Sequence, residues 1–231
     1  MSGGNTTDRV LGGGRAIFRN RDYSLYLSSR FLWGLGQQIQ NIAIAWLVYE
    51  LTRDPLALGL IGLAAFLPVI GFSLVTGPVA DRYDRRIIIV LCSIVMASAS
   101  ASVIVMMLTG YINASRIWPL YLVVVVMGAA RAFSGPAGQA FVMSLVPRKS
   151  FAPAAAWNNT VNQSATLLGP SIGGLLFPLG AMVPFSLAAI VLGLSALLAG
   201  LIGIKPVAEA RPRMTLAMLC LLYTSPSPRD Q

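Results

Sequence analysis

Six long apolar segments constrain what this chain can fold into more than any other feature. The predicted spans run over residues 31–51, 56–80, 87–109, 117–146, 153–177 and 181–204. Each is long enough for the hydrocarbon core of a bilayer, which takes about 20 mostly apolar helical residues. Of the chain's 231 residues, 56% are apolar and only 11% are charged, whereas soluble domains carry roughly 25% charge. We therefore expect an all-α, polytopic membrane protein with six transmembrane helices.

The fourth segment is unusually long and contains both Arg131 and Pro136. It is either one tilted, kinked helix or a helix followed by an interfacial segment. We expect one helix, because the next basic boundary appears only at Arg148 and Lys149.

Basic residues favour the loops on one side of the expected bundle. Thirteen precede the first span or follow the second, fourth and sixth spans: Arg9, Arg15, Arg19, Arg21, Arg30, Arg82, Arg85, Arg86, Arg148, Lys149, Lys205, Arg211 and Arg213. The alternate loops hold only Arg53 and Arg116. This asymmetry predicts an even number of spans in the cell's inner membrane, with both natural ends cytoplasmic. The net charge of +9 is therefore distributed by loop rather than gathered into a patch, which argues against a nucleic-acid partner.

The chain divides into four expected regions. Residues 1–30 form a cytoplasmic N-terminal segment, residues 31–204 the six-helix transmembrane bundle, and residues 205–219 the start of a central cytoplasmic loop or a next region. Residues 220–230 read CLLYTSPSPRD, which resembles a translated sequencing adapter. The transposase mosaic end TGTCTCTTATACACATCT encodes its first six residues. We therefore expect residues 220–231 to be an adapter-derived artefact and set them aside before fold reasoning.

The residues that most enzymes and metal sites need are scarce. Histidine is absent, and the two cysteines are Cys92 and Cys220. These counts exclude Ser/His/Asp and Cys/His catalysis, the usual zinc sites and haem ligation by histidine. We expect neither an enzyme nor a cofactor or metal site.

A charged loop, GPVADRYDRR at residues 77–86, separates the second and third segments. We expect a tight cytoplasmic turn opened by Gly77, with Asp81 at a helix end and arginines close by. An acid there accepts backbone N–H groups or pairs with arginine, which makes a latch between conformations. An ordinary positive-inside loop is the alternative for the arginines alone.

This loop closely resembles the signature loop of the major facilitator superfamily, G-x-L-A-D-R-x-G-R-[RK], in the form typical of its drug and siderophore exporters. Val79 replaces the usual leucine and Asp84 the usual glycine. The resemblance extends to the lead-in at residues 18–23, the first outer boundary at 46–52, and the fourth helix and its exit at 132–137 and 145–147. It assigns cytoplasmic gating to Gly77, Asp81, Arg82, Asp84, Arg85 and Arg86.

The resemblance implies the N-terminal half of a twelve-helix secondary transporter that lies in the lipid bilayer and exports a drug-like or siderophore-like small molecule by alternating access. The C-terminal six-helix half would be its missing partner. An inverted three-plus-three repeat is expected, since Pro68 and Pro170 occupy broadly corresponding places. The competing hypothesis is a non-transporting fragment, or a half-bundle that functions only with a partner chain.

Small residues line one face of the fifth segment. Ala165, Gly169 and Gly173 are four apart, Gly174 follows them, and Pro170 removes a backbone hydrogen bond. The pattern favours either close helix packing or a conformational hinge, in about equal measure.

Polar side chains within the segments are candidates for cavity lining. The first segment carries Gln37, Gln40 and Asn41, the fourth carries Arg131, and the fifth carries Asn158, Asn159, Asn162 and Gln163. Interhelical hydrogen bonding is the alternative for the amides, and a structural role is the alternative for the arginine. The resemblance favours cavity lining for the amides.

A proton carrier is missing from this part of the sequence. No Asp or Glu lies inside a predicted span, and Glu50 stands at an outer helix end. Coupling to an ion such as H⁺ would use Glu50, the missing half, or another gradient.

Overall fold

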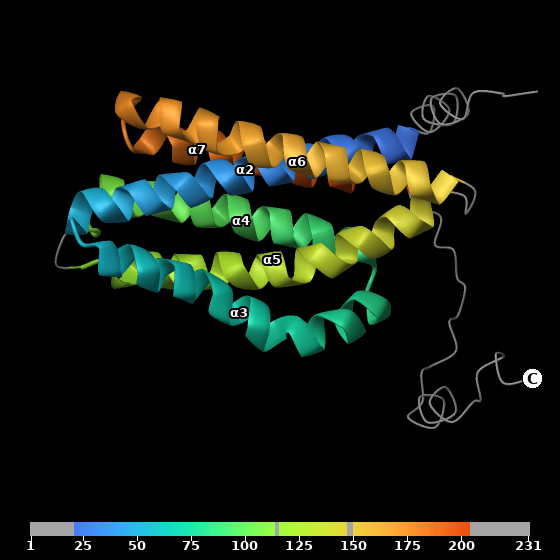
Figure 1. The fold of residues 1–231 in the computed structure, drawn as a ribbon, viewed down its shortest axis with the longest axis horizontal. Coiled ribbons are helices and arrows are strands. Elements are labelled where there is room, and N and C mark those ends of the chain that lie inside the picture. The colour runs from blue at the N-terminus through green and yellow to red at the C-terminus, as the bar shows by residue number, and fades with distance from the viewer. Residues whose placement is uncertain (1–20, 114–115, 147–149, 204–231) are drawn as a thin grey trace, which may run out of the picture.

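Six long α-helices succeed one another and run alternately in opposite directions along the long axis (Figure 1). The computed structural model describes residues 21–113, 116–146 and 150–203. The helices are α2 (Arg21–Thr52), α3 (Pro55–Arg82), α4 (Arg85–Leu108), α5 (Trp118–Leu145), α6 (Phe151–Leu176) and α7 (Met182–Gly200), with a 3-10 turn, η2 (Phe177–Leu179), between the last two. The all-α expectation is confirmed for these residues. The expectations for residues 1–20, 205–219 and 220–231 fall outside the residues that the structure describes.

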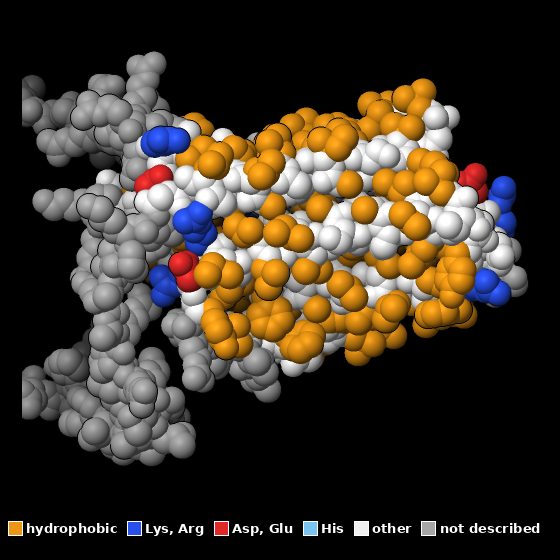
Figure 2. Space-filling model, turned by 180° about the vertical axis from the view of Figure 1, so that it is seen from behind, with side chains coloured by type: hydrophobic (Ala, Val, Ile, Leu, Met, Phe, Trp, Pro, Cys, Tyr) orange, Lys and Arg blue, Asp and Glu red, His pale blue; other side chains and the backbone are white. Residues whose placement is uncertain are grey.

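Four of the helices are apolar enough to cross a bilayer. The qualifying stretches are Pro55–Ser73 of α3 and the whole of α4, α5 and α7. The helices α2 and α6 are also long, at 32 and 26 residues, but each carries a run of amide side chains. Length and composition in the described residues therefore support four spans, and six spans are not confirmed. Apolar side chains cover the flank of the bundle between two charged ends (Figure 2).

The first helix begins at Arg21, ahead of the predicted span at residues 31–51. Two tyrosines tie this early part to the bundle, since the hydroxyl of Tyr23 donates to the carbonyl oxygen of Ala154 and that of Tyr26 to Gly138, each at 2.8 Å. Both rings are buried. The segment expected to be a cytoplasmic lead-in is therefore helical from Arg21 onward and packed against α5 and α6.

The long fourth segment forms one helix, as expected. Pro136 lies inside α5 without ending it. Because proline removes one backbone hydrogen bond, a helix continues through it only when its neighbours hold it in place.

The first three helices (α2–α4) and the last three (α5–α7) pack in a symmetric pattern. The main neighbours of α2 are α6 and α7, those of α5 are α3 and α4, and α4 packs against α7. Exchanging α2, α3 and α4 with α5, α6 and α7 converts the α2 pairs into the α5 pairs and leaves the α4–α7 pair as it is. Since α2 and α5 run in opposite directions (Figure 1), this is the arrangement of an inverted repeat.

The small-residue face of α6 lies against α2. A Cβ added at Gly169 would lie 2.4 Å from the Cβ of Gln38, and one added at Gly173 would lie 2.4 Å from the Cγ2 of Ile42. Those distances are too short for two carbon atoms, so the two helices can approach this closely only because glycine stands at both positions. Gly174 faces open space, where an added Cβ meets nothing within 4 Å.

The symmetry-related pair, α5 and α3, has a similar close contact. A Cβ added at Gly128 of α5 would lie 2.5 Å from the carbonyl oxygen of Ala65 and 3.2 Å from the ring of Pro68, both in α3. In the first pair, a Cβ added at Gly34 of α2 would lie 2.9 Å from the Cβ of Ala165 in α6. Each contact thus combines a glycine with an alanine that precedes a proline by a few residues.

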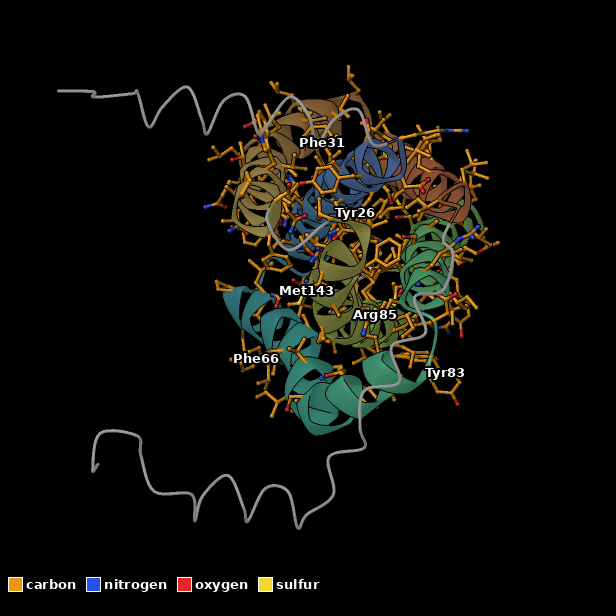
Figure 3. The ribbon with its side chains drawn as sticks, turned by 90° about the vertical axis from the view of Figure 1, so that its right-hand side faces the viewer. Tyr26, Phe31, Phe66, Tyr83, Arg85 and Met143 are labelled. Carbon is orange, nitrogen blue, oxygen red and sulfur yellow. The ribbon has the colours of Figure 1, made fainter. Side chains whose placement is uncertain are left out.

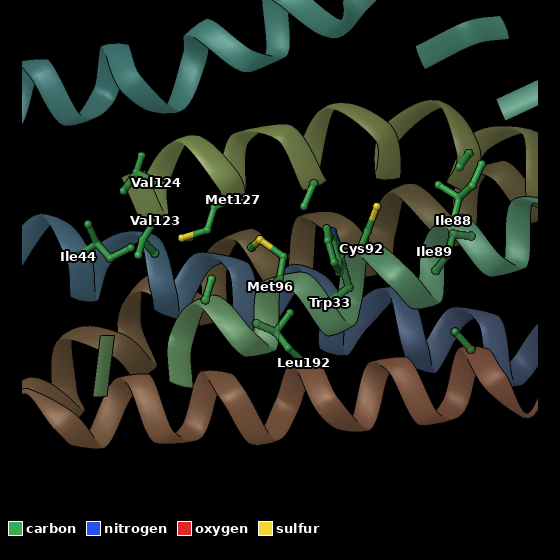
Figure 4. Close-up of a cluster of buried hydrophobic side chains, with 14 of the residues drawn as sticks. Trp33, Ile44, Ile88, Ile89, Cys92, Met96, Val123, Val124, Met127 and Leu192 are labelled. Atoms are coloured by element: carbon green, nitrogen blue, oxygen red, sulfur yellow. The ribbon is translucent and has the colours of Figure 1, made fainter. Parts of the chain in front are cut away.

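The core is built where α2, α4, α5 and α7 converge (Figure 4). Met96, Met127 and Leu192 are almost fully buried there. Beside the core, the hydroxyls of Ser29 in α2 and Ser195 in α7 each donate to the other residue's carbonyl oxygen, at 3.0 and 2.9 Å. These reciprocal bonds join two residues that are 166 positions apart in the chain.

Alanine substitutions at two glycines of α6 are predicted to have opposite effects on stability. Gly169→Ala places its Cβ against Gln38 and should destabilise the bundle by about 1–3 kcal/mol, as overpacking does. Gly174→Ala enters open space and should stabilise α6 by up to about 1 kcal/mol, because alanine is the better helix former. Thermal unfolding of the purified full chain in detergent measures both, and equal shifts for the two variants would contradict the packing described.

Candidate functional site

A cavity of about 230 Å³ lies among α2, α3 and α5. It is lined by Asn41, Ile44, Ala45, Leu58, Ile61, Gly62, Ala65, Val124, Met127 and Arg131. Most of this lining is apolar, and the polar groups come from Asn41 of α2 and Arg131 of α5. The cavity therefore has the composition of a small-molecule site, in which a few polar groups stand in an apolar wall.

Arg131 and Asn41 are joined across the α2–α5 contact. The Nη1 of Arg131 donates to the Oδ1 of Asn41 at 3.3 Å, and the Nδ2 of Asn41 donates to the Oε1 of Gln38 at 3.2 Å. The Nε of Arg131 is buried without a hydrogen-bond partner. An amide oxygen supplies only a dipole, so the guanidinium charge has no opposite charge in this pair.

A second guanidinium group lies on the same contact, nearer the end of α5. The Nη1 of Arg30 donates to the Oγ of Ser134 at 3.3 Å, and its Nε is also buried without a partner. Gly138 makes room for it, since an added Cβ would lie 3.2 Å from the Nη1 of Arg30. The sequence pattern predicts for Arg30 only a place among the cytoplasmic charges. Arg30 precedes Gln37 by seven residues and Asn41 by eleven, which puts all three on one helix face. This spacing is the sequence feature that indicates a place for Arg30 beside the polar residues of α2.

The structure separates the other predicted lining residues of α2 from the cavity. Gln40 is fully buried against α4, where its Nε2 donates to the carbonyl oxygen of Met96 at 3.3 Å and its Oε1 has no partner. Gln37 is half-buried and does not line the cavity. Of the three amides predicted on this helix, Asn41 alone lines it.

The amides of α6 lie away from this cavity as well. Asn158 is buried and its Oδ1 has no partner, whereas Asn159 and Gln163 are exposed and Asn162 is half-buried. None of the four contributes to the lining. Their predicted role at another part of a larger cavity stays a prediction.

The charged loop differs from the expected turn at its first residue. Gly77 lies inside α3, which continues to Arg82, so the turn is made by Tyr83 and Asp84 instead. The Oδ1 of Asp84 accepts from the backbone N of Arg86 at 2.9 Å and so caps the start of α4. The backbone of residues 81–82 is helical, but their side chains lie outside what the structure describes.

The arginines of the loop reach the neighbouring helices. The Nη1 of Arg85 donates to the carbonyl oxygen of Ala140 in α5 at 3.3 Å, and the Nη2 of Arg86 donates to that of Gly200 in α7. Figure 3 looks onto this end of the bundle, where Arg85 and Tyr26 both lie beside α5. Arg86 therefore binds the last residue of α7, where a backbone carbonyl has no partner within its own helix, whereas Arg85 binds α5 about one turn before its end.

The predicted hinge residues of α6 include both buried and exposed positions. Gly169 and Gly173 are buried against α2, while Pro170 is exposed. The helix continues through Pro170, and a bending role for this residue stays a prediction.

A model of the family described as transmembrane secretion effector matches residues 14–219, which is most of the chain. The chain therefore belongs to this family of major facilitator superfamily transporters, and it is a multi-pass membrane protein.

Relatives named as transporters or efflux proteins match part of the chain. The uncharacterized MFS-type transporter YfiS of Bacillus subtilis is 28% identical over 164 residues, which cover 70% of this chain and 37% of YfiS. Macrolide efflux protein A of Streptococcus pyogenes is 24% identical over 60% of this chain and 34% of its own length. The staphyloferrin A transporter of Staphylococcus aureus is 26% identical over 65% of this chain and 38% of its own length. The chain thus covers less than two fifths of each of these curated relatives.

Substitutions at Asp84 are predicted to separate helix capping from charge. Asp84→Ala removes the cap of α4 and should lower the free energy of unfolding by about 0.5–2 kcal/mol. Asp84→Ser keeps a capping oxygen without the charge and should retain most of the stability. Thermal unfolding in detergent compares the two variants. An equal loss in both would mean that the carboxylate charge, rather than the cap, stabilises this turn.

Proposed function

We propose that the chain is the N-terminal six-helix half of a twelve-helix secondary transporter in the cell's inner membrane, with both ends cytoplasmic. Its activity would be the export of drug-like or siderophore-like small molecules by alternating access. Family membership and the names of the relatives, a macrolide efflux protein and a staphyloferrin A transporter, support this class of substrate.

The observation that carries the proposal is the cavity between α2, α3 and α5. Polar side chains deep in a membrane bundle are costly, and they mark substrate or ion pathways when they face a cavity. Arg131 and Asn41 meet this description, since they occupy an otherwise apolar wall. The inverted packing of the two three-helix units supports the same class of protein, because transporters of this kind place their sites at repeat interfaces.

The loop at residues 77–86 would act as the cytoplasmic gate. Arg85 and Arg86 already bind the ends of α5 and α7, so a movement of those helices would break these bonds. The side chains of Asp81 and Arg82 would complete the gate against the second half. A coupling ion such as H⁺ would use Glu50, which is exposed at the end of α2, the second half, or another gradient.

The alternative is a fragment that does not transport, or a half-bundle that acts only with a partner chain. This alternative needs a test because the chain covers only 37% of YfiS and 34% of macrolide efflux protein A. Resequencing the locus across codons 218–231 with a method free of the suspected adapter distinguishes the two. A reading frame that continues into six more apolar segments supports the transporter, and a stop codon there supports the half-bundle.

Membrane topology tests α6, one of the two helices whose composition leaves the span count open. In a background without cysteine, Ser150→Cys before α6 should react with an impermeant maleimide only after permeabilisation. Gly180→Cys after α6 should react in intact cells, and Tyr83→Cys serves as the cytoplasmic control. If positions 150 and 180 react alike, α6 does not cross the membrane and the six-span proposal is wrong.

Transport is tested with fluorescent dyes in bacteria that lack their main efflux pumps. The reading frame restored beyond residue 219 should lower the retention of a preloaded dye at least about twofold, because secondary export opposes passive entry. An uncoupler that leaves ATP intact should abolish the effect. The 231-residue chain serves as a parallel sample, and efflux by it alone would support the half-bundle. Efflux that continues with the uncoupler, or none from either form, would contradict secondary export.

A further inference from the structure

Among the residues that the structure describes, two guanidinium groups on the α2–α5 contact have no negatively charged partner. Arg131 is bound to the Asn41 amide and Arg30 to the Ser134 hydroxyl, and both partners are neutral. The Nε atoms of both arginines are buried and make no hydrogen bond. Ser134 is one helical turn from Arg131, so both charges lie on the same face of α5.

The described acidic side chains lie at the ends of the helices. Asp22 begins α2 and Glu50 stands near its other end, while Asp54 and Asp84 cap α3 and α4. None of them lines the cavity. Within the described residues the cavity is therefore positively charged, and its apolar walls weaken the screening of that charge.

An unpaired guanidinium group in such a place is costly to the protein. Burying a charge is tolerated when it is paired or when it serves a ligand. The guanidinium group also suits one kind of ligand well, because its parallel N–H groups bind a carboxylate at two points.

We propose that the substrate is an amphipathic organic anion whose carboxylate binds Arg131 in this cavity, with Arg30 extending the positive surface toward the end of α5. This inference rests on the proposed function and specifies its substrate class. A volume of about 230 Å³ is below the roughly 300–1,000 Å³ of sites that enclose a drug-sized ligand. The cavity therefore holds the charged end of the molecule. Ile61, Val124 and Met127 contact the adjoining apolar part.

Binding of two dyes to the purified full chain in a neutral detergent tests the proposal. Carboxyfluorescein and rhodamine 123 share a xanthene ring but carry opposite net charge at pH 7. Fluorescence anisotropy should show tighter binding of carboxyfluorescein by at least about tenfold, as expected for a focused positive potential.

Three variants locate the effect. Arg131→Gln should weaken carboxyfluorescein binding at least about tenfold, because a charge-assisted pair is lost. Asn41→Asp keeps the shape of the site but supplies an internal anion, and it should likewise weaken carboxyfluorescein while strengthening rhodamine 123. Arg116→Gln removes an exposed arginine that precedes α5 and does not line the cavity, and it should change neither dye. If Arg131→Gln does not fold, Asn41→Asp carries the test.

The outcomes separate this inference from the proposed function. Equal binding of the two dyes, or carboxyfluorescein binding that is unaffected by Asn41→Asp and Arg131→Gln, would overturn the anion inference while leaving transport open. Charge-selective binding in a protein that moves neither dye would support the anion site and contradict the transport proposal.

Discussion

Polar groups within this bundle must find their partners in the bundle, because lipid offers them none. The arrangement of α2 follows from that constraint. Its tyrosines donate to carbonyls of α5 and α6, Ser29 exchanges bonds with Ser195 of α7, and Gln40 donates to α4. A helix with so many polar side chains is poorly suited to face lipid, and so it is surrounded by other helices. The more apolar α3 has the smallest buried share among the four stretches that qualify as spans.

The inverted arrangement explains why two close helix contacts look alike. In each, a glycine of a central helix faces an alanine on a helix that contains a proline, as Gly34 faces Ala165 and Gly128 faces Ala65. Close backbone approach maximises dispersion contacts, which is how membrane helices associate without a hydrophobic driving force. The two halves differ in their polar content, since only α5 brings a charge to the cavity wall.

Hydropathy predicts most of the helices, and the helical spacing of polar residues predicts only part of the site. The fourth predicted span, 117–146, matches α5 at Trp118–Leu145, because long apolar runs have clear ends. The predicted span starts at residue 31, whereas α2 begins at Arg21. Hydropathy does not include the hydrogen bonds that bury Tyr23 and Tyr26, so it does not predict this earlier start. Helical spacing placed Gln40 and Asn41 together as polar residues, but the rotation of the helix, which is set by packing, turns one toward α4 and the other toward the cavity.

The reciprocal serine bonds between α2 and α7 have a consequence for biosynthesis. They join residues separated by 166 positions, and α2 also packs along the late helix α6. At roughly 5–20 residues per second, a ribosome needs about 8–33 seconds to cover that distance. Until α7 is made, Ser29 has no Ser195 to bond with, so the α2–α7 contact can form only after the last described helix has been synthesised.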